Sequence, residues 1–261
     1  MSEITNINRP SYLTDADDAK YSDQIQKLNE YGKPLTIKVI QGNTGLPYKP
    51  PFAEGDAIIT PEAIKIGDEK TPFTFIPLCF FSTFVCVNPY QMRGTLSTIR
   101  EFSFDPNSDV AKKARAFTVL PCPQNEKLDI KYRVNLNWFI IVDGLPQYAD
   151  RPIHLRMSGG DYKYGQSLIT LIQGRWNNHK APSPACRFRG FVETHTSGPN
   201  SWKGLGFLND PIPFVEDVNL YKKYDDLATL MNKGIEERSI DVDLGEDEDA
   251  AAANAASDKK Y

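Results

Sequence analysis

The segment Lys131–Val142, KYRVNLNWFIIV, alternates apolar with polar side chains and restricts the fold of this chain more than any other stretch. Because successive side chains of an extended strand point to opposite faces, the alternation assigns each side chain to one of two faces. The segment therefore predicts a strand with one face in a core and one face that presents cations, amides and a ring. The first face carries Tyr132, Val134, Leu136, Trp138, Ile140 and Val142, and the second carries Lys131, Arg133, Asn135, Asn137 and Phe139.

Other segments are rich in β-branched and aromatic residues and are bounded by glycine, proline or asparagine, which is typical of strands. Apolar side chains at helical spacing predict short helices at residues 108–117, where Ser108 or Asp109 caps the start, and at 166–173 and 217–231. The expected fold class is α+β and mainly β, with a few short helices. Strands are expected at residues 35–41, 57–66, 73–87, 153–157, 186–194 and 202–208.

Three parts of the chain differ in composition. Residues 1–33 are polar and turn-rich and predict an N-terminal arm, whereas residues 34–235 hold the expected strands and helices of one domain. Residues 236–261 have few apolar side chains to offset the entropy of ordering, so they predict a disordered tail. No segment reaches the roughly 20 apolar residues of a membrane span, and the first residues lack the pattern of an export signal. We therefore expect a cytoplasmic protein that does not associate with membranes.

The formal net charge of −4 conceals a segregation of charge along the chain. Between residues 241 and 261, seven acids stand against two lysines, which gives −5 and leaves +1 for the rest. Residues 131–208 contain ten lysines and arginines and four acids, which gives +6. A basic segment followed by an acidic terminus indicates contact with nucleic acid.

The sequence contains no recognisable catalytic or metal-binding motif. The stretch SGGDYKYGQS, residues 158–167, has the glycine spacing of a phosphate-binding loop, but Gln166 stands where such a loop needs a lysine. The three histidines and four cysteines are too widely spaced for a metal site, and we expect Cys79, Cys86, Cys122 and Cys186 to be reduced thiols. We therefore expect a protein that is not an enzyme and that holds neither a cofactor nor a metal.

Aromatic and basic residues interleave within the basic segment, which contains all three tryptophans. Rings that stack on bases beside cations that contact phosphates are what the binding of single-stranded nucleic acid requires. The candidate stacking rings are Trp138, Phe139, Tyr162, Tyr164, Trp176, Phe188, Phe191 and Trp202. The candidate phosphate contacts are Lys131, Arg133, Arg156, Lys163, Arg175, Arg187, Arg189 and Lys203.

The basic, aromatic and β-rich body, the helix at 217–231 and the acidic terminus ending in Tyr261 resemble the single-stranded DNA-binding proteins of tailed bacteriophages. The resemblance covers residues 35–233 and implies an elaborated OB-fold, a partly open five-stranded barrel that binds oligonucleotides, here with strands 131–142 and 186–194. It implies a protein that coats and protects single-stranded DNA during replication or recombination in an infected bacterium. It also implies that the tail recruits replication proteins such as polymerase and helicase through Asp241, Asp243, Glu246, Asp247, Glu248, Asp249 and Tyr261.

Two other functions remain open at this point. The first is a structural or assembly module of a virion that binds no nucleic acid, because prolines, tyrosines and edge strands are equally ordinary there. The second is an enzyme of nucleic-acid metabolism, such as a nuclease, whose motif cannot be read from the sequence. Binding of a single strand that weakens steeply with salt separates the first from a DNA-binding protein. Cleavage of a labelled strand with divalent metal would identify the second.

Overall fold

The computed structural model describes residues 34–42, 51–92, 97–210 and 212–238. The predicted N-terminal arm and the part of the predicted acidic tail from residue 239 onward lie outside the described residues. Within these ranges, none of the helices combines the length and the apolar character that crossing a bilayer demands. The described chain is mainly β.

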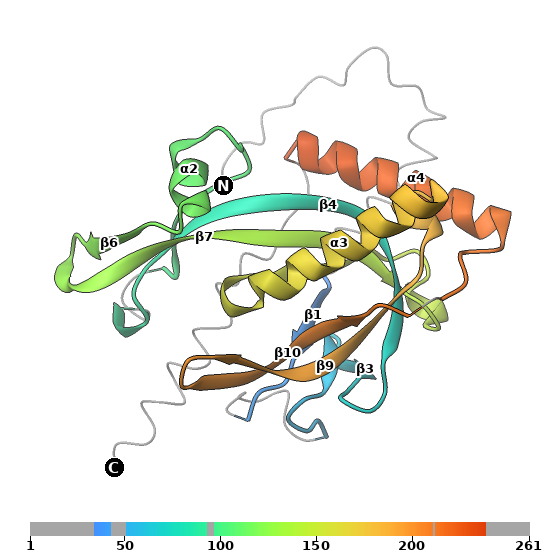
Figure 1. Ribbon diagram of the computed structural model, residues 1–261, viewed down its shortest axis with the longest axis horizontal. Coiled ribbons are helices and arrows are strands. Elements are labelled where there is room, and N and C mark those ends of the chain that lie inside the picture. Colours follow the sequence, from blue (N-terminus) through green and yellow to red (C-terminus); the bar gives the residue numbers. More distant parts are fainter. Residues whose placement is uncertain (1–33, 43–50, 93–96, 211, 239–261) are drawn as a thin grey trace, which may run out of the picture.

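Ten strands form one sheet that curls into a half-barrel (Figure 1). The main path through the sheet runs in the order β10, β9, β4, β7, β8, β1, β2, β3, with β5 beside β4 and β6 beside β7. The strands are β1 (Thr36–Val39), β2 (Ala57–Thr60), β3 (Ile64–Gly67), β4 (Phe73–Val87), β5 (Ile99–Ser103), β6 (Val119–Cys122), β7 (Asn125–Val142), β8 (Ile153–Met157), β9 (Phe188–Ser197) and β10 (Asn200–Leu208).

The centre of the sheet has the strand order of a Greek key. Strands β4, β7 and β8 pair antiparallel in succession, and β9 returns to pair antiparallel with the start of β4. Strand β10 pairs with β9, and β1 pairs in parallel with β8 at the other end. The side-chain amide of Gln41 donates to the Lys203 carbonyl at 2.6 Å and accepts from the Lys203 N–H at 3.0 Å. This pair of hydrogen bonds draws the chain after β1 to β10.

Three α-helices and four short 3-10 helices complete the described chain. Ser108 Oγ accepts from Ala111 N–H at the start of α2, so the predicted cap at Ser108 is confirmed. Asp217, for which no cap was predicted, accepts from Asn219 and Leu220 N–H at the start of α4. Helix α3 is longer than predicted, because the last part of the glycine-rich stretch is helical. The bounds are α2 (Asp109–Arg115), α3 (Tyr162–His179), α4 (Val218–Glu236), η1 (Tyr90–Met92), η2 (Pro146–Tyr148), η3 (Gly159–Asp161) and η4 (Ser183–Ala185).

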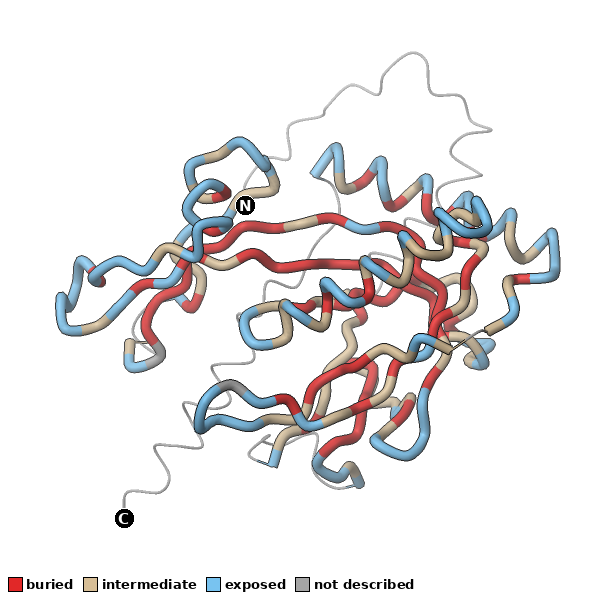
Figure 2. The backbone as a smooth tube through the Cα atoms, in the orientation of Figure 1, coloured by how far each residue is buried: buried red, intermediate tan, exposed pale blue. Residues whose placement is uncertain are grey.

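The predicted core face of β7 is confirmed, but its other face is not open along most of the strand. Figure 2 shows that the two long strands, β4 and β7, are buried over most of their length. Helix α4 covers this second face, where Met231 packs against Phe139. Asn137 is fully buried beside it and donates to Thr83 Oγ1 at 3.2 Å. The prediction of an exposed second face is therefore wrong between Asn135 and Ile141, because a strand covered on both sides presents nothing to solvent.

Two glycines of α3 provide a test of how tightly this helix packs on the sheet. A Cβ atom at Gly165 would lie 2.8 Å from Met157 Cβ and 3.0 Å from Leu136 Cδ1, whereas one at Gly174 would meet no atom within 4 Å. Gly165→Ala is expected to lower the free energy of unfolding by about 1–3 kcal/mol because it overpacks the core. Gly174→Ala is expected to raise it by about 0.5–1 kcal/mol because alanine favours the helix. Denaturant unfolding measures both values, and a gain for Gly165→Ala would contradict this packing.

Candidate nucleic-acid interface

The glycine-rich stretch and the start of α3 form a packed cluster around Asp161. Asp161 Oδ1 accepts hydrogen bonds from Trp202 Nε1 and from His195 Nδ1, both at 2.7 Å. The ring of Tyr164 stacks on the fully buried His195, with ring centroids 3.4 Å apart and planes 4° from parallel. A Cβ atom at Gly160 would overlap the indole of Trp202, so glycine is needed there to give that ring room. These contacts account for the glycine-rich sequence by packing within the protein, without any bound anion.

The predicted stacking rings fall into three groups. Trp138, Phe139 and Phe188 lie in the core with at most 4 % of their surface exposed, so no base can stack on them. Tyr164 and Trp202 are held in the Asp161 cluster, and Phe191 is half-buried on β9. The remaining two are open to solvent to different degrees: Trp176 is 52 % exposed near the end of α3, and half-buried Tyr162 begins that helix.

Most predicted phosphate contacts on β9, β10 and the end of α3 already have partners within the protein. Arg187 pairs with Asp143 at 3.0 Å, Arg189 pairs with Asp210 at 2.6 Å, and Lys203 pairs with Glu69. Arg175 donates to the Asp210 carbonyl at 3.4 Å. The acidic partners offset part of the charge of +6 that residues 131–208 carry in the sequence. Of the other four, Lys131 and Lys163 are exposed, and Arg133 and Arg156 are half-buried.

A different group of cations and rings gathers where α2 ends and α3 begins. The rings of Phe117 and Tyr162 meet edge to face, with centroids 5.8 Å apart. Phe117 is 59 % exposed. Lys113 Nζ lies 5.1 Å above the ring of Tyr132, and the Arg115 guanidinium lies 5.1 Å from the ring of Phe84. We call this group the α2 surface and define it as Lys112, Lys113, Arg115, Phe117, Tyr162 and Lys163.

The α2 surface contains four cations, of which Lys112 pairs with Asp109 at 3.2 Å. Asp105 and Glu236 lie near Arg115, with which they line one pocket. Lys113, Arg115 and Lys163 are exposed and form no ion pair with a carboxylate among the described residues. Lys131 alternates to the opposite face of β7 from Tyr132 and does not belong to this surface. The arrangement can therefore bind an extended anion that also carries flat rings.

The backbone at Phe117 adopts a conformation that phenylalanine rarely takes. Its φ is +49°, in the left-handed region. Phe117 N–H donates to the Ala114 carbonyl and Thr118 N–H donates to the Lys113 carbonyl, both at 3.0 Å. These two bonds form a Schellman motif, in which glycine is the usual residue at the left-handed position. Such strain costs on the order of 1–3 kcal/mol and concentrates at functional sites.

Sequence reasoning found Tyr162 and Lys163 but missed the rest of the α2 surface. The sequence predicts a helix with Lys112, Lys113 and Arg115 on its solvent-facing side. These three cations precede the basic segment 131–208 and so do not contribute to its charge of +6. Phe117 closes that helix in the sequence pattern as an apolar residue. The left-handed turn that exposes its ring has no sequence signal here, because the glycine that usually marks it is absent.

The described residues contain no group of three or more histidine, cysteine, aspartate or glutamate side chains that could hold a metal ion. All four cysteines are buried free thiols. Burial raises the pKa of the Cys79 thiol to about 12 and that of the Cys186 thiol to about 11, which makes both poor nucleophiles at neutral pH.

Comparison of the chain with protein-family models, with curated proteins and with solved structures finds no match. The functional assignment therefore depends on strand topology and on the geometry of the α2 surface.

Proposed function

We propose that the protein binds single-stranded DNA through the α2 surface and that it catalyses no reaction. The topology supports this function. Strands β4, β7, β8, β9 and β10 have the pairing of a five-stranded Greek-key barrel, with α3 between the third and fourth strands. An OB-fold is a partly open barrel of this kind, so we propose that the half-barrel is an elaborated OB-fold.

The position of the α2 surface supports the same proposal. OB-folds bind oligonucleotides at the face of the second and third strands and at the loops that join strands one to two and four to five. Here the connection from β4 to β7 contains α2, and the turn from β9 to β10 is the second such loop. In Figure 1 both lie at the same end of the molecule, at the left of the view, with one end of α3 between them.

The observation that carries the proposal is the exposed ring of Phe117, held at an unfavourable backbone angle beside Tyr162 and among cations. A fold that only needed a helix end would be more stable with glycine at this position. An exposed ring on a left-handed turn gives unpaired bases a surface to stack on, and each stacked base contributes about 1–3 kcal/mol. The cations around it contact phosphates without reading the base sequence.

Binding of this kind coats a strand and shields it, which is the role expected in DNA replication or recombination. The acidic residues from Asp241 onward would then be available to recruit polymerase or helicase. This recruitment depends on sequence alone, because those residues lie outside the described ones.

The proposal is tested by titrating the full chain with a fluorescent oligothymidine at several salt concentrations. Affinity is expected to fall as salt rises, and log K should fall linearly with log[salt] by about 0.7 for each phosphate contacted. A duplex of equal length should bind more weakly, because its bases are not free to stack. Absence of binding would contradict the proposal and favour a virion module, and cleavage of the strand with Mg²⁺ would favour a nuclease.

A further inference from the structure

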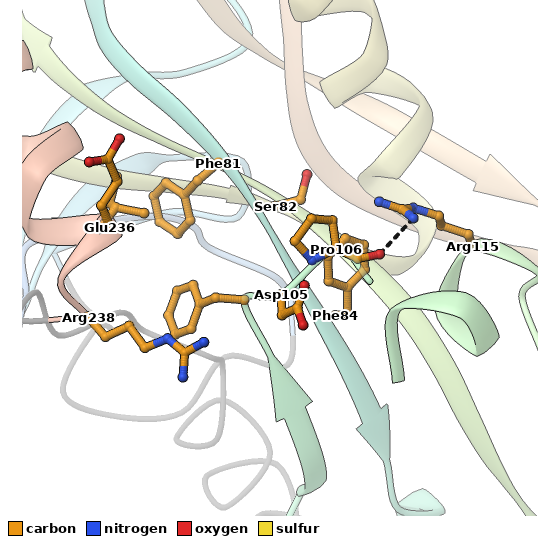
Figure 3. A pocket seen from close by; sticks show the side chains of 10 residues that line it. Phe81, Ser82, Phe84, Asp105, Pro106, Arg115, Glu236 and Arg238 are labelled. Carbon is orange, nitrogen blue, oxygen red and sulfur yellow. Dashed lines mark hydrogen bonds between the residues drawn. The ribbon is translucent and has the colours of Figure 1, made fainter. Parts of the chain in front are cut away.

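An open pocket lies directly beside the α2 surface and shares Arg115 with it. Its volume is about 520 Å³, within the roughly 300–1,000 Å³ of pockets that bind small molecules. Strand β4, the chain between β5 and α2, the end of α2 and the end of α4 form its walls (Figure 3). The residues that matter for its chemistry are the rings of Phe81, Phe84 and Phe104, the guanidinium groups of Arg115 and Arg238, and the carboxylate of Asp105.

The floor of the pocket is aromatic. The rings of Phe81 and Phe104 lie 6.3 Å apart with planes 29° from parallel. Phe102, which is 52 % exposed, meets Phe104 edge to face at 6.0 Å and extends this row of rings toward solvent. A row of rings that reaches from the core to the surface suits a flat aromatic ligand, because it offers faces and edges for stacking.

The rim of the pocket carries hydrogen-bond donors on its arginines and acceptors on its carboxylates. Arg115 donates one N–H group to the Pro106 carbonyl at 2.8 Å, and a guanidinium has five N–H donors in all. Asp105 Oδ1 accepts from Asn107 N–H at 2.8 Å, which leaves further acceptor positions on the carboxylate. Arg115 can therefore bind a phosphate while Asp105 accepts from an amino group.

The pocket is continuous with the α2 surface. Arg115 lines the pocket and belongs to the α2 surface, and Phe117 follows it by two residues. Two residues span at most about 7 Å of chain, so Arg115 and Phe117 are close enough in the chain for neighbouring nucleotides of one strand to reach them. With Asp105 and Glu236 beside the two arginines, the rim carries both donors and acceptors and no formal net charge.

We infer that this pocket holds one nucleotide of the bound strand and selects a base with an exocyclic amino group. The base lies against the half-buried Phe104 ring, its phosphate contacts Arg115, and its amino group donates to Asp105. Cytosine presents such an amino group, from which an aspartate carboxylate accepts a hydrogen bond. Uracil presents a carbonyl oxygen at the same position. This inference rests on the proposed function and adds a base preference to it.

The test compares oligodeoxycytidine with oligodeoxyuridine of equal length, both titrated against the full chain. Neither base carries a methyl group, so the pair differs in hydrogen bonding. The wild-type protein is expected to bind oligodeoxycytidine about 3- to 10-fold more tightly, the effect of one hydrogen bond to a charged acceptor exposed to solvent. Asp105→Asn is expected to abolish or reverse this preference, because its amide adds a donor and its remaining oxygen still accepts from Asn107 N–H.

Asp109→Asn is the matched control, since it removes an acid of the same neighbourhood that does not line the pocket, and it should keep the preference. Phe104→Leu should weaken binding of both oligonucleotides, because it removes the ring and keeps an apolar side chain. Equal binding of the two oligonucleotides by the wild type, or an unchanged preference in Asp105→Asn, would contradict base selection by the pocket. The proposed function would remain intact. Failure of both oligonucleotides to bind would overturn the proposed function and the pocket with it.

Discussion

Replacing Phe117 with glycine is expected to weaken oligothymidine binding about 5- to 150-fold, the equivalent of the 1–3 kcal/mol that one stacked base contributes. The same substitution should leave the free energy of unfolding unchanged or raise it by up to about 1 kcal/mol. Glycine adopts the φ of +49° without strain, and the ring it removes is mostly exposed. The measurements are a fluorescence titration and a denaturant unfolding curve on the same preparation.

The opposite signs of these two effects distinguish a binding role from a structural one. If the Phe117 ring serves only to pack against Tyr162, the substitution lowers stability and leaves affinity unchanged. Trp176→Ala is the matched control, because this ring is also about half exposed and stands at the other end of α3. Fourteen residues of helix place Trp176 about 21 Å from Tyr162, so its loss should not affect binding. Equal losses for the two variants would argue against an interface centred on α2.

Replacing Asp161 with alanine is expected to lower the free energy of unfolding by about 2–5 kcal/mol. The carboxylate is the acceptor for both Trp202 Nε1 and His195 Nδ1, and hydrogen bonds to a charged group contribute about 1.5–3 kcal/mol each. The alanine variant leaves both donors without this partner, and His195 is fully buried. Asp161→Asn should lose less, because its amide oxygen still accepts.

Unfolding by urea, followed by tryptophan fluorescence, measures the effect of the Asp161 variants. Asp226→Ala is the control, since this acid is exposed on α4 and its loss should change stability by less than about 0.5 kcal/mol. A loss below about 1 kcal/mol for Asp161→Ala would show that the cluster does not hold the start of α3 in place. The close approach of Gly160 to the Trp202 indole would then need another explanation.

Several elements could be predicted because their signals are local. The strand ranges 73–87 and 153–157 agree with β4 and β8, and the cap at Ser108 marks the start of α2. Strands β5 and β6 were missed. Each is short, β5 has no buried residue, and β6 is exposed at three of its four residues and contains a proline, so neither has the alternation that identifies a strand.

The candidate site was harder to predict, because exposure depends on what packs over a residue. Phe139 and Lys131 lie on the same predicted face of the alternating segment, yet Phe139 is buried and Lys131 is exposed. Arg187 and Lys113 carry the same charge, yet Asp143 pairs with Arg187 across the fold and no acid among the described residues pairs with Lys113. A sum of charges along the sequence does not show that Arg187 forms an ion pair with Asp143, which is 44 residues away.

The sequence by itself determined the mainly β character, the core face of β7 and the helix cap at Ser108, because periodicity and capping act between residues a few positions apart. Only the tertiary structure decided which rings and cations remain accessible. Helix α4 covers the second face of β7, acids offset Arg187 and Arg189, and a left-handed turn exposes Phe117 beside Tyr162. Each of these outcomes depends on contacts between segments far apart in the chain, and the free energy of such contacts is not encoded in any local pattern.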